Sequence, residues 1–358
     1  PAPFGFRTPD EVVYDMSQQL PDTEGYSPSK GLFSARKAIM QYAQLKNIPN
    51  VSIDDIYTGN GVSELINLSL SALLDNGDEV LVPSPDYPLW TACVNLAGGT
   101  AVHYVCDEDS EWYPDIDDMR SKITDKTKAI VIINPNNPTG ALYPKEVLQQ
   151  IVDLAREHQL MIFSDEIYDR LVMDGLEHIS IASLAPDLFC VTFSGLSKSH
   201  MIAGWRVGWM IAPLDVAKAA SKLQGHMTSN VNNISQRAAI AAVSGSLDAV
   251  YEMREAFDKR RQTIVAALND IEGVNCPTPT GAFYAFADVS ALLNKPLGTS
   301  KTAYASTSEL AAALLDEGHV AAVPGEAFGA PGYLRFSYAL ADDDLVEGMK
   351  RMKQWVED

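Results

Sequence analysis

Between Glu79 and Ala212, short apolar runs alternate with stretches of helical periodicity, and this alternation limits the fold more than any other feature of the chain. The predicted strands are residues 79–83, 102–106, 129–134, 160–164, 189–193 and 207–212. The predicted helices between them include residues 89–96, 116–123 and a stretch that ends near His158. Strands that are joined through helices run parallel, and helices then cover both faces of the sheet. The sequence therefore predicts an α/β fold with a mostly parallel central sheet.

A smaller α+β unit is predicted after a long, charged helix at residues 246–271. Its predicted elements are a helix at 308–317, strands at 320–324 and 334–337, and a closing helix at 342–356. Residues 291–307 contain Gly, Pro, Ser and Thr throughout, which predicts a flexible surface insertion. A chain of 358 residues is long enough for one large domain and one smaller domain.

The composition argues against several classes of function. The net charge of −20 disfavours nucleic-acid and anionic-membrane partners, because binding to both depends on positive charge. The longest aliphatic run, Ala129–Ile133, is far too short to span a bilayer, and no signal sequence opens the chain, so we expect a cytoplasmic protein. The four cysteines lack CxxC spacing and the six histidines lack HxxxH pairing, so we expect no metal site.

A glycine-rich turn precedes the helix predicted at residues 63–74. In Gly59-Asn60-Gly61-Val62-Ser63-Glu64, the N–H groups at the helix start could bind an anion at the positive end of the helix dipole. The sixth position is Glu64, so the stretch does not match the dinucleotide-binding GxGxxG pattern. Phosphate binding and an ordinary helix cap are both compatible with this turn.

Lys198 lies in an unusual place for a lysine. It follows the apolar run Cys190-Val191-Thr192-Phe193, so we expect its amine at the end of a buried strand. A partly desolvated amine loses its proton easily, and a neutral amine attacks aldehydes. Arg206 lies eight residues later, just before the next predicted strand. Taken alone, the two residues could equally be a loop lysine and a paired strand-end cation.

Several other residues, like Lys198, lie just beyond the end of an apolar run. Gly61, Asn137, Asp165 and Lys198 would meet at one edge of a parallel sheet. With Tyr168 they offer an amine for an aldehyde, a carboxylate for a protonated ring nitrogen and donors for a phenolate oxygen, which is typical of a pyridoxal phosphate site. Each has a structural alternative, since Asp165 could cap a helix, Asn137 could form an Asx-turn and Tyr168 could lie in the core. Their combination favours the cofactor site.

Four motifs resemble those of the class I aminotransferases of fold type I. They are Asn134-Pro135-Asn136-Asn137-Pro138-Thr139-Gly140, Ser164-Asp165-Glu166-Ile167-Tyr168, Gly195-Leu196-Ser197-Lys198 with Gly204-Trp205-Arg206-Val207-Gly208, and Leu334-Arg335-Phe336-Ser337-Tyr338. Residues 1–6, 59–64 and 85–90 are most similar to bacterial alanine (glutamate–pyruvate) aminotransferases. The resemblance covers nearly the whole chain. It implies a pyridoxal-phosphate enzyme that moves an amino group between an L-amino acid and a 2-oxo acid, with alanine/pyruvate and glutamate/2-oxoglutarate as the expected pairs.

The resemblance implies catalytic roles for three residues. Lys198 would bond to the cofactor aldehyde and later move a proton to and from the substrate Cα. Asp165 would keep the ring nitrogen protonated, because a neighbouring carboxylate raises the pKa of that nitrogen. Tyr168 would donate to the ring oxygen, together with Asn137.

The remaining implied contacts concern the phosphate, the ring face and the substrate. The residues implied at the phosphate are Gly61, Val62, Ser63, Ser197, Arg206 and, from a neighbouring subunit, Tyr26. Tyr87 would stack on the ring, with Trp90 one turn further along. Arg335 would bind the substrate α-carboxylate as a bidentate pair, assisted by Asn137. The reach of Tyr26 into a partner's site implies a homodimer.

The resemblance also implies domain limits. Residues 1–25 would be an N-terminal segment belonging to the small domain, 26–257 the large cofactor-binding domain, and 258–358 the small domain. We expect an arm upstream of Pro1 to be missing.

Two positions depart from the family pattern. Gly195 stands where many relatives carry a phosphate-binding serine, so Ser197 or Ser194 would supply that hydroxyl, or nothing does. Met201 is bulkier than the residue usual at its position, which leaves the geometry of its loop open.

Alternative functions fit the same sequence. The enzyme could prefer aspartate or aromatic amino acids, or it could be a pyridoxal-phosphate-dependent β-lyase, because fold and cofactor do not fix the reaction. Outside the enzymes, an aminotransferase-like domain could sense a ligand in a regulator. The sequence carries no basic DNA-binding module, which argues against the regulator.

Overall fold

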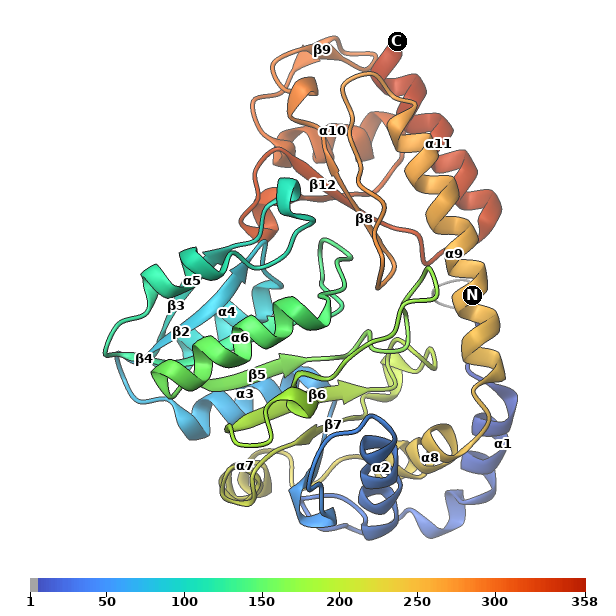
Figure 1. Ribbon diagram of the computed structural model, residues 1–358. Helices are drawn as coiled ribbons and strands as arrows, with labels where there is room; N and C mark the ends of the chain where they lie inside the picture. The colour runs from blue at the N-terminus through green and yellow to red at the C-terminus, as the bar shows by residue number, and fades with distance from the viewer. Residues whose placement is uncertain (1–5) are drawn as a thin grey trace.

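A seven-stranded sheet forms the centre of the larger unit in the computed structural model, which describes residues 6–358 (Figure 1). The strands are β1 (Ile56–Gly59), β2 (Glu79–Ser84), β3 (Thr100–Val105), β4 (Thr127–Ile133), β5 (Met161–Asp165), β6 (Cys190–Gly195) and β7 (Gly208–Ile211). Their order across the sheet is β1-β7-β6-β5-β4-β2-β3. The strand β7 runs antiparallel to β1 and to β6, and the other strand pairings in the described part of this sheet are parallel. The prediction of a mostly parallel sheet is confirmed.

Helices cover both faces of this sheet, and the alternation of side chains along β4 shows why its sequence is continuously apolar. Val131 packs in a cluster with α3 (Val62–Leu73), α4 (Pro88–Leu96) and α7 (Leu214–Met227). Its neighbours Ile130 and Ile132 point the other way, into a cluster with α5 (Ile116–Lys122) and α6 (Lys145–His158). A strand buried on both faces has no position that favours a polar residue.

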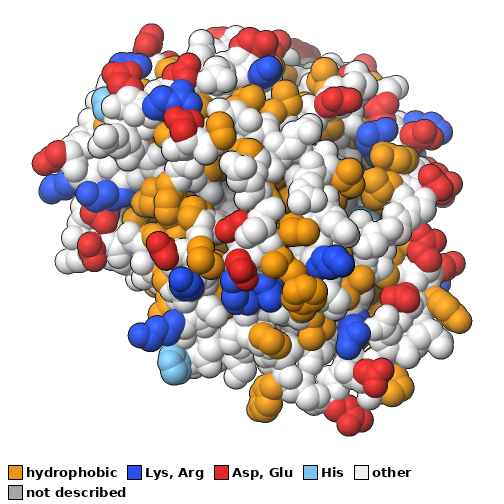
Figure 2. Space-filling model, turned by 60° about the horizontal axis from the view of Figure 1, so that its bottom comes forward, with side chains coloured by type: hydrophobic (Ala, Val, Ile, Leu, Met, Phe, Trp, Pro, Cys, Tyr) orange, Lys and Arg blue, Asp and Glu red, His pale blue; other side chains and the backbone are white. Residues whose placement is uncertain are grey.

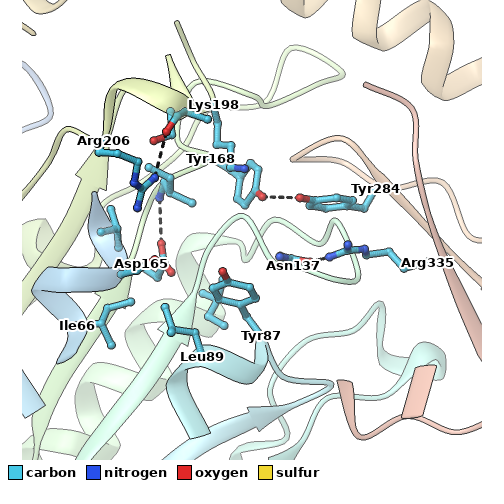
Figure 3. A pocket seen from close by; sticks show the side chains of 16 residues that line it. Ile66, Tyr87, Leu89, Asn137, Asp165, Tyr168, Lys198, Arg206, Tyr284 and Arg335 are labelled. Carbon is cyan, nitrogen blue, oxygen red and sulfur yellow. Dashed lines mark hydrogen bonds between the residues drawn. The ribbon is translucent and has the colours of Figure 1, made fainter. Parts of the chain in front are cut away.

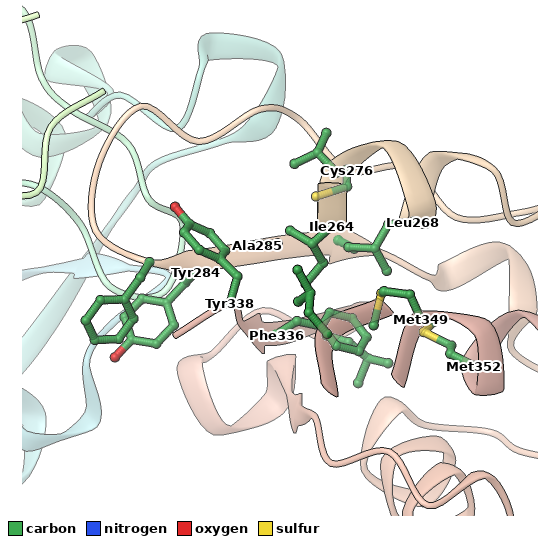
Figure 4. Packing of buried hydrophobic residues seen from close by; sticks show 14 of the residues in the cluster. Ile264, Leu268, Cys276, Tyr284, Ala285, Phe336, Tyr338, Met349 and Met352 are labelled. Carbon is green, nitrogen blue, oxygen red and sulfur yellow. The ribbon is translucent and has the colours of Figure 1, made fainter. Parts of the chain in front are cut away.

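The smaller unit packs three helices against a three-stranded antiparallel sheet. The strands, in the order β11-β12-β8, are β11 (Val323–Pro324), β12 (Tyr333–Ser337) and β8 (Tyr284–Asp288). The helices are α9 (Asp248–Asn269), α10 (Thr307–Gly318) and α11 (Asp342–Glu357). Figure 4 shows Ile264 and Leu268 of α9 near Met349 and Met352 of α11, in the same cluster as Phe336 of β12. Long α9 continues from α8 (Asn233–Ser244) of the larger unit into this core (Figure 1).

Two details of the smaller unit differ from the sequence prediction. The strand expected at 320–324 is limited to β11, at Val323–Pro324. The segment expected to be a flexible insertion contains a short hairpin of β9 (Pro296–Leu297) and β10 (Thr302–Ala303). Leu297 is buried, and the Gly298 N–H donates to the Trp355 carbonyl of α11 at 3.0 Å, so this segment packs on the unit.

The N-terminal segment contacts both units. The Phe6 ring meets Phe257 of α9 edge-on, with centroids 5.6 Å apart. Val12 of α1 (Asp10–Gln18) packs with Ile39 of α2 (Phe33–Leu45) and Ala238 of α8. The assignment of residues 1–25 to the small domain, and the limits 26–257 and 258–358, therefore stay predictions. The motif at residues 1–6 lies almost wholly outside the described residues.

In the described part of the chain, no helix combines the length and the apolar character needed to cross a membrane.

Candidate active site

A cavity of about 310 Å³ lies beyond the carboxyl ends of β4, β5 and β6, and the smaller unit contributes Tyr284 and Arg335 to its wall (Figure 3). This is the position where open parallel sheets bind ligands. The predicted site residues that line it are Val62, Ser63, Tyr87, Asn137, Asp165, Tyr168, Ser197, Lys198, Arg206 and Arg335. Of the predicted set, Gly61 caps the helix beside the cavity, and Tyr26 is 92% exposed and absent from its wall.

Lys198 follows the end of β6 and enters the cavity from above the ring of Tyr168 (Figure 3). Its Nζ lies 5.6 Å from the Phe283 ring centroid and 5.9 Å from that of Tyr168. Burial lowers the pKa of the amine, and the positive charges of Arg335 and Arg206 lower it further, while Asp165 opposes them. A lysine in this setting is more easily neutral, and therefore nucleophilic, than one in water.

The loop after Lys198 has a special backbone conformation. Met201 adopts a φ of 57° and is buried in the cluster that contains Val250 and Met253. The Met201 side chain, which is bulkier than the residue usual at this position in the family pattern, therefore packs between the loop and α9.

Asp165 is the last residue of β5 and is almost completely buried. Burial raises the pKa of its carboxyl to about 6, against hydrogen bonds from the Ile167 N–H and the Trp90 indole that lower it. These donors lie 3.2 Å and 3.4 Å away and are both neutral. A buried carboxylate held only by neutral donors is a strong site for a cationic group on a ligand. Trp90, one turn beyond Tyr87, packs into the core against Phe163 and Phe193.

Arg335 of β12 reaches the cavity from the smaller unit, and its guanidinium lies over two aromatic rings. The Tyr284 and Phe328 ring centroids lie 4.3 Å and 4.8 Å from its central carbon. Nη1 donates to Asn137 Oδ1 at 2.7 Å, while the buried Nε has no hydrogen-bond partner. The guanidinium therefore keeps donors for a carboxylate, in the planar arrangement that favours a bidentate pair.

The start of α3 forms a second cationic corner of the cavity. Gly61 adopts a φ of 84° and is the residue before Val62, where the helix begins. A side chain at Gly61 would place Cβ 2.4 Å from Nη2 of Arg206, so the absence of one lets the guanidinium lie against the turn. Arg206 donates to the Asn60 carbonyl at 3.2 Å and to the Ala203 carbonyl at 3.1 Å. Free helical N–H groups beside an arginine make a site for a phosphate group.

The structure separates the candidates for the serine that Gly195 replaces. Ser197 lines the cavity, whereas the Ser194 hydroxyl donates to the Glu166 carbonyl at 3.4 Å. A Cβ at Gly195 would lie 3.1 Å from the Gly208 Cα of the neighbouring strand, which is tight even for a small side chain. Close packing of β6 on β7 therefore accounts for this glycine.

Sequence reasoning missed a buried ionic cluster behind the cavity. Lys46, just after α2, lies 3.0 Å from Glu166 Oε2 and 2.7 Å from Asp169 Oδ2. Burial disfavours the charge on Asp169, but the positive charges, led by Lys46, more than compensate and lower its pKa to about 2. Ser164 and Ser180 donate to the other oxygen of Glu166 at 3.0 Å and 2.8 Å. The cluster fixes the segment that carries both Asp165 and Tyr168, and no local sequence signal links it to Lys46.

Tyr284 was also missed. Its hydroxyl lies 2.8 Å from the Tyr168 hydroxyl (Figure 3). The sequence shows only an aromatic run at residues 283–286, and the contact joins residues 116 positions apart.

Comparisons with known proteins agree with this site and fold. A family model described as aminotransferase class I and II matches residues 5–351. The chain is 50% identical over 298 residues to the glutamate-pyruvate aminotransferase AlaA of Escherichia coli K12, which covers 81% of this chain and 74% of that protein. It is 44% identical over 367 residues to the protein of the same name from Haemophilus influenzae, covering 100% of this chain and 89% of that one.

Solved structures agree as well. An aminotransferase from Escherichia coli superposes with a TM-score of 0.93 at 43% identity, covering 100% of this chain and 89% of that chain. An aspartate aminotransferase from Rhizobium meliloti gives 0.94 at 31% identity, covering 98% and 88%. The family and the fold that the four motifs predicted are both confirmed, and this chain belongs to the class I and II aminotransferases.

Proposed function

We propose that this aminotransferase uses pyridoxal 5′-phosphate and exchanges an amino group between alanine/pyruvate and glutamate/2-oxoglutarate. The observation that carries the proposal is the convergence of Lys198, Asp165 and Arg335 on one cavity. The names of the relatives, glutamate-pyruvate aminotransferase and alanine aminotransferase, support this substrate pair over aspartate.

The residues present fit the cofactor. Asp165, whose carboxylate is buried among neutral donors, would pair with the protonated ring nitrogen. Tyr168 and Asn137 would donate to the ring oxygen, and Tyr87 would lie on the ring face. The phosphate would be held by the turn at Gly61 and by Val62, Ser63, Ser197 and Arg206.

When bound, the cofactor supplies an aldehyde that condenses with amines and a protonated ring that accepts the electron pair left at the substrate Cα. The amine of Lys198, whose pKa is lowered by burial, would take the proton from the substrate Cα and would deliver it to the carbon that becomes bonded to hydrogen when the amino group is transferred. Arg335 holds the α-carboxylate, with Asn137 fixing the guanidinium. The same residues would then bind the 2-oxo acid and carry out the proton transfers in the reverse order.

The assignment of Lys198 is tested by substitution. Lys198→Ala removes both the amine that bonds to the cofactor and the group that moves the proton, so turnover should fall by at least about 10³-fold. Borohydride reduction of the native protein with pyridoxal phosphate should attach the cofactor to Lys198, as located by peptide mass spectrometry. Lys222→Ala, at an exposed lysine of α7, is the control and should behave like the native protein. Full activity in Lys198→Ala, or a label on another lysine, would refute the assignment.

A substrate panel separates the alternative reactions. Alanine with 2-oxoglutarate should give pyruvate and glutamate without free ammonia. Ammonia and pyruvate from sulfur amino acids would indicate a β-lyase, and a preference for aspartate or aromatic donors would change the substrate assignment. Binding without turnover of any donor would favour the ligand-sensing regulator.

We further propose a homodimer in which Tyr26 contacts the phosphate of the partner's cofactor. Its 92% exposure and its absence from the cavity of its own chain support a role across an interface. A cytoplasmic location, the lack of nucleic-acid and membrane partners and the absence of a metal stay predictions from the sequence.

A further inference from the structure

Tyr284 touches two functional groups that come from different units of the molecule. Its hydroxyl lies 2.8 Å from that of Tyr168, which follows β5 of the larger unit. The face of its ring lies 4.3 Å from the central guanidinium carbon of Arg335, on β12. Tyr284 is buried, and Figure 3 shows it beside the cavity with its hydroxyl directed at Tyr168.

The number of hydrogens determines which hydroxyl donates in the hydrogen bond between Tyr284 and Tyr168. A tyrosine hydroxyl has one hydrogen to donate. If Tyr168 gives its hydrogen to the cofactor's ring oxygen, it can only accept from Tyr284. The hydrogen of Tyr284 must then point at Tyr168, which makes a chain of two donors that ends on the ring oxygen.

We propose that Tyr284 is a positioning residue whose hydroxyl orients the proton of Tyr168 towards the cofactor and whose ring holds Arg335 flat for the substrate carboxylate. This inference rests on the proposed function. The two roles belong to different parts of one side chain, so they can be separated.

The hydroxyl has a predictable effect on the bound cofactor. Hydrogen bonds in a chain strengthen one another, so donation from Tyr284 makes Tyr168 a better donor. A better donor stabilises negative charge on the ring oxygen and weakens that oxygen's hold on the proton it shares with the nitrogen of the lysine bond. Loss of the Tyr284 hydroxyl should therefore raise the pKa at which the lysine-bound cofactor loses this proton.

The other charged and titratable groups around the pair stay in place in the test. They are Asp165 at the end of β5, Lys198 after β6, Arg335 on β12, Tyr87 before α4 and Arg206 before β7. A change confined to the Tyr284 hydroxyl alters none of them.

The experiment compares three variants of the full chain loaded with pyridoxal phosphate. Tyr284→Phe removes the hydroxyl and keeps the ring, and Tyr284→Leu removes both. Tyr338→Phe is the matched control, because the Tyr338 hydroxyl is buried in the same core but donates to the Ala282 carbonyl at 3.2 Å, away from the cavity. Each is titrated with pH by the absorbance of the bound cofactor, and KM for alanine is measured separately.

In Tyr284→Phe the absorbance titration should shift upward by about half a pH unit, the order of one net hydrogen bond, with KM changed less than about twofold. In Tyr284→Leu the same shift should be joined by a rise in KM of about fivefold or more, from loss of the ring against Arg335. Tyr338→Phe should match the native protein in both.

The outcomes distinguish the two proposals. If the absorbance of Tyr284→Phe titrates at the same pH as that of the native protein, the proposed role of the hydroxyl is wrong. If KM for alanine is unchanged in Tyr284→Leu, the proposed role of the ring is wrong. An equal shift in Tyr338→Phe would mean that general loosening of the core is the cause, which also overturns the inference. A native protein that shows no absorbance from a bound cofactor would instead refute the proposed function.

Discussion

At the scale of single residues, Asp165 shows how a functional site works against stability. Its carboxyl has a pKa of about 6, because burial penalises the charged form. The ordinary value is about 3.9. A group whose pKa is raised on folding stabilises the fold fully below its unfolded pKa and loses that contribution as the pH rises through the folded value. Without cofactor, the protein should therefore carry an unfavourable charge at Asp165 at neutral and alkaline pH.

Asp165→Asn should stabilise the cofactor-free protein while abolishing activity. A rise of about two units in pKa corresponds to about 3 kcal/mol at pH 8, and the gain should shrink as the pH falls from about 6 towards 4. Urea unfolding at several pH values measures this change. Asp316→Asn, on an exposed face of α10, should change the free energy of unfolding by less than about 0.5 kcal/mol. A gain that is equal at pH 5 and pH 8 would count against the explanation.

At the scale of elements, the start of α3 depends on one missing side chain. Gly61→Ala would place a methyl group 2.4 Å from Arg206 Nη2 and push the guanidinium away from the helix start. Because a charge-assisted contact to the phosphate would be lost, we expect affinity for pyridoxal phosphate to fall by about tenfold or more. The measurement is a fluorescence titration of the cofactor-free protein.

Gly77→Ala is the control for backbone strain. Gly77 also has a positive φ, of 90°, but a Cβ there meets nothing within 4 Å. Both variants should lose stability, on the order of 1–3 kcal/mol, because a positive φ is unfavourable for alanine. Only Gly61→Ala should bind the cofactor weakly. Equal affinities in the two variants would show that Arg206 is not placed by this glycine.

The sequence predicted the elements that have a local pattern, and it did not predict contacts between distant elements. The strands were predictable because β4 and its neighbours are buried on both faces and so read as unbroken apolar runs. Asp165 and Lys198 were predictable because Asp165 ends β5 and Lys198 lies in the loop just after β6. The roles of Tyr284 and Lys46 depend on contacts with Tyr168 and Asp169 across 116 and 123 positions, and no local pattern encodes such pairing.

At the scale of the whole molecule, a strongly acidic chain concentrates positive charge where its anionic ligands would bind. The net charge is −20, yet Lys198, Arg206 and Arg335 all line one cavity. On the face shown in Figure 2, positive and negative side chains are interspersed with apolar ones. The exposed apolar residues of the chain include Tyr26, Phe33 and Met227. Anion binding is therefore a property of the cavity rather than of the overall charge.

Mixed dimers test whether Tyr26 serves the partner's site. Tyr26→Ala alone should weaken cofactor binding by about tenfold, through loss of a hydrogen bond to the phosphate, and Tyr14→Ala, at another exposed tyrosine, should not. In a dimer of one Tyr26→Ala chain and one Lys198→Ala chain, the site that keeps Lys198 receives Tyr26 from its partner. That site should bind pyridoxal phosphate with native affinity, as measured on dimers purified with two different tags. The opposite result, weak binding that persists in the mixed dimer, would place Tyr26 at the site of its own chain or remove it from the site, because only a contact across the interface can be restored by the second subunit.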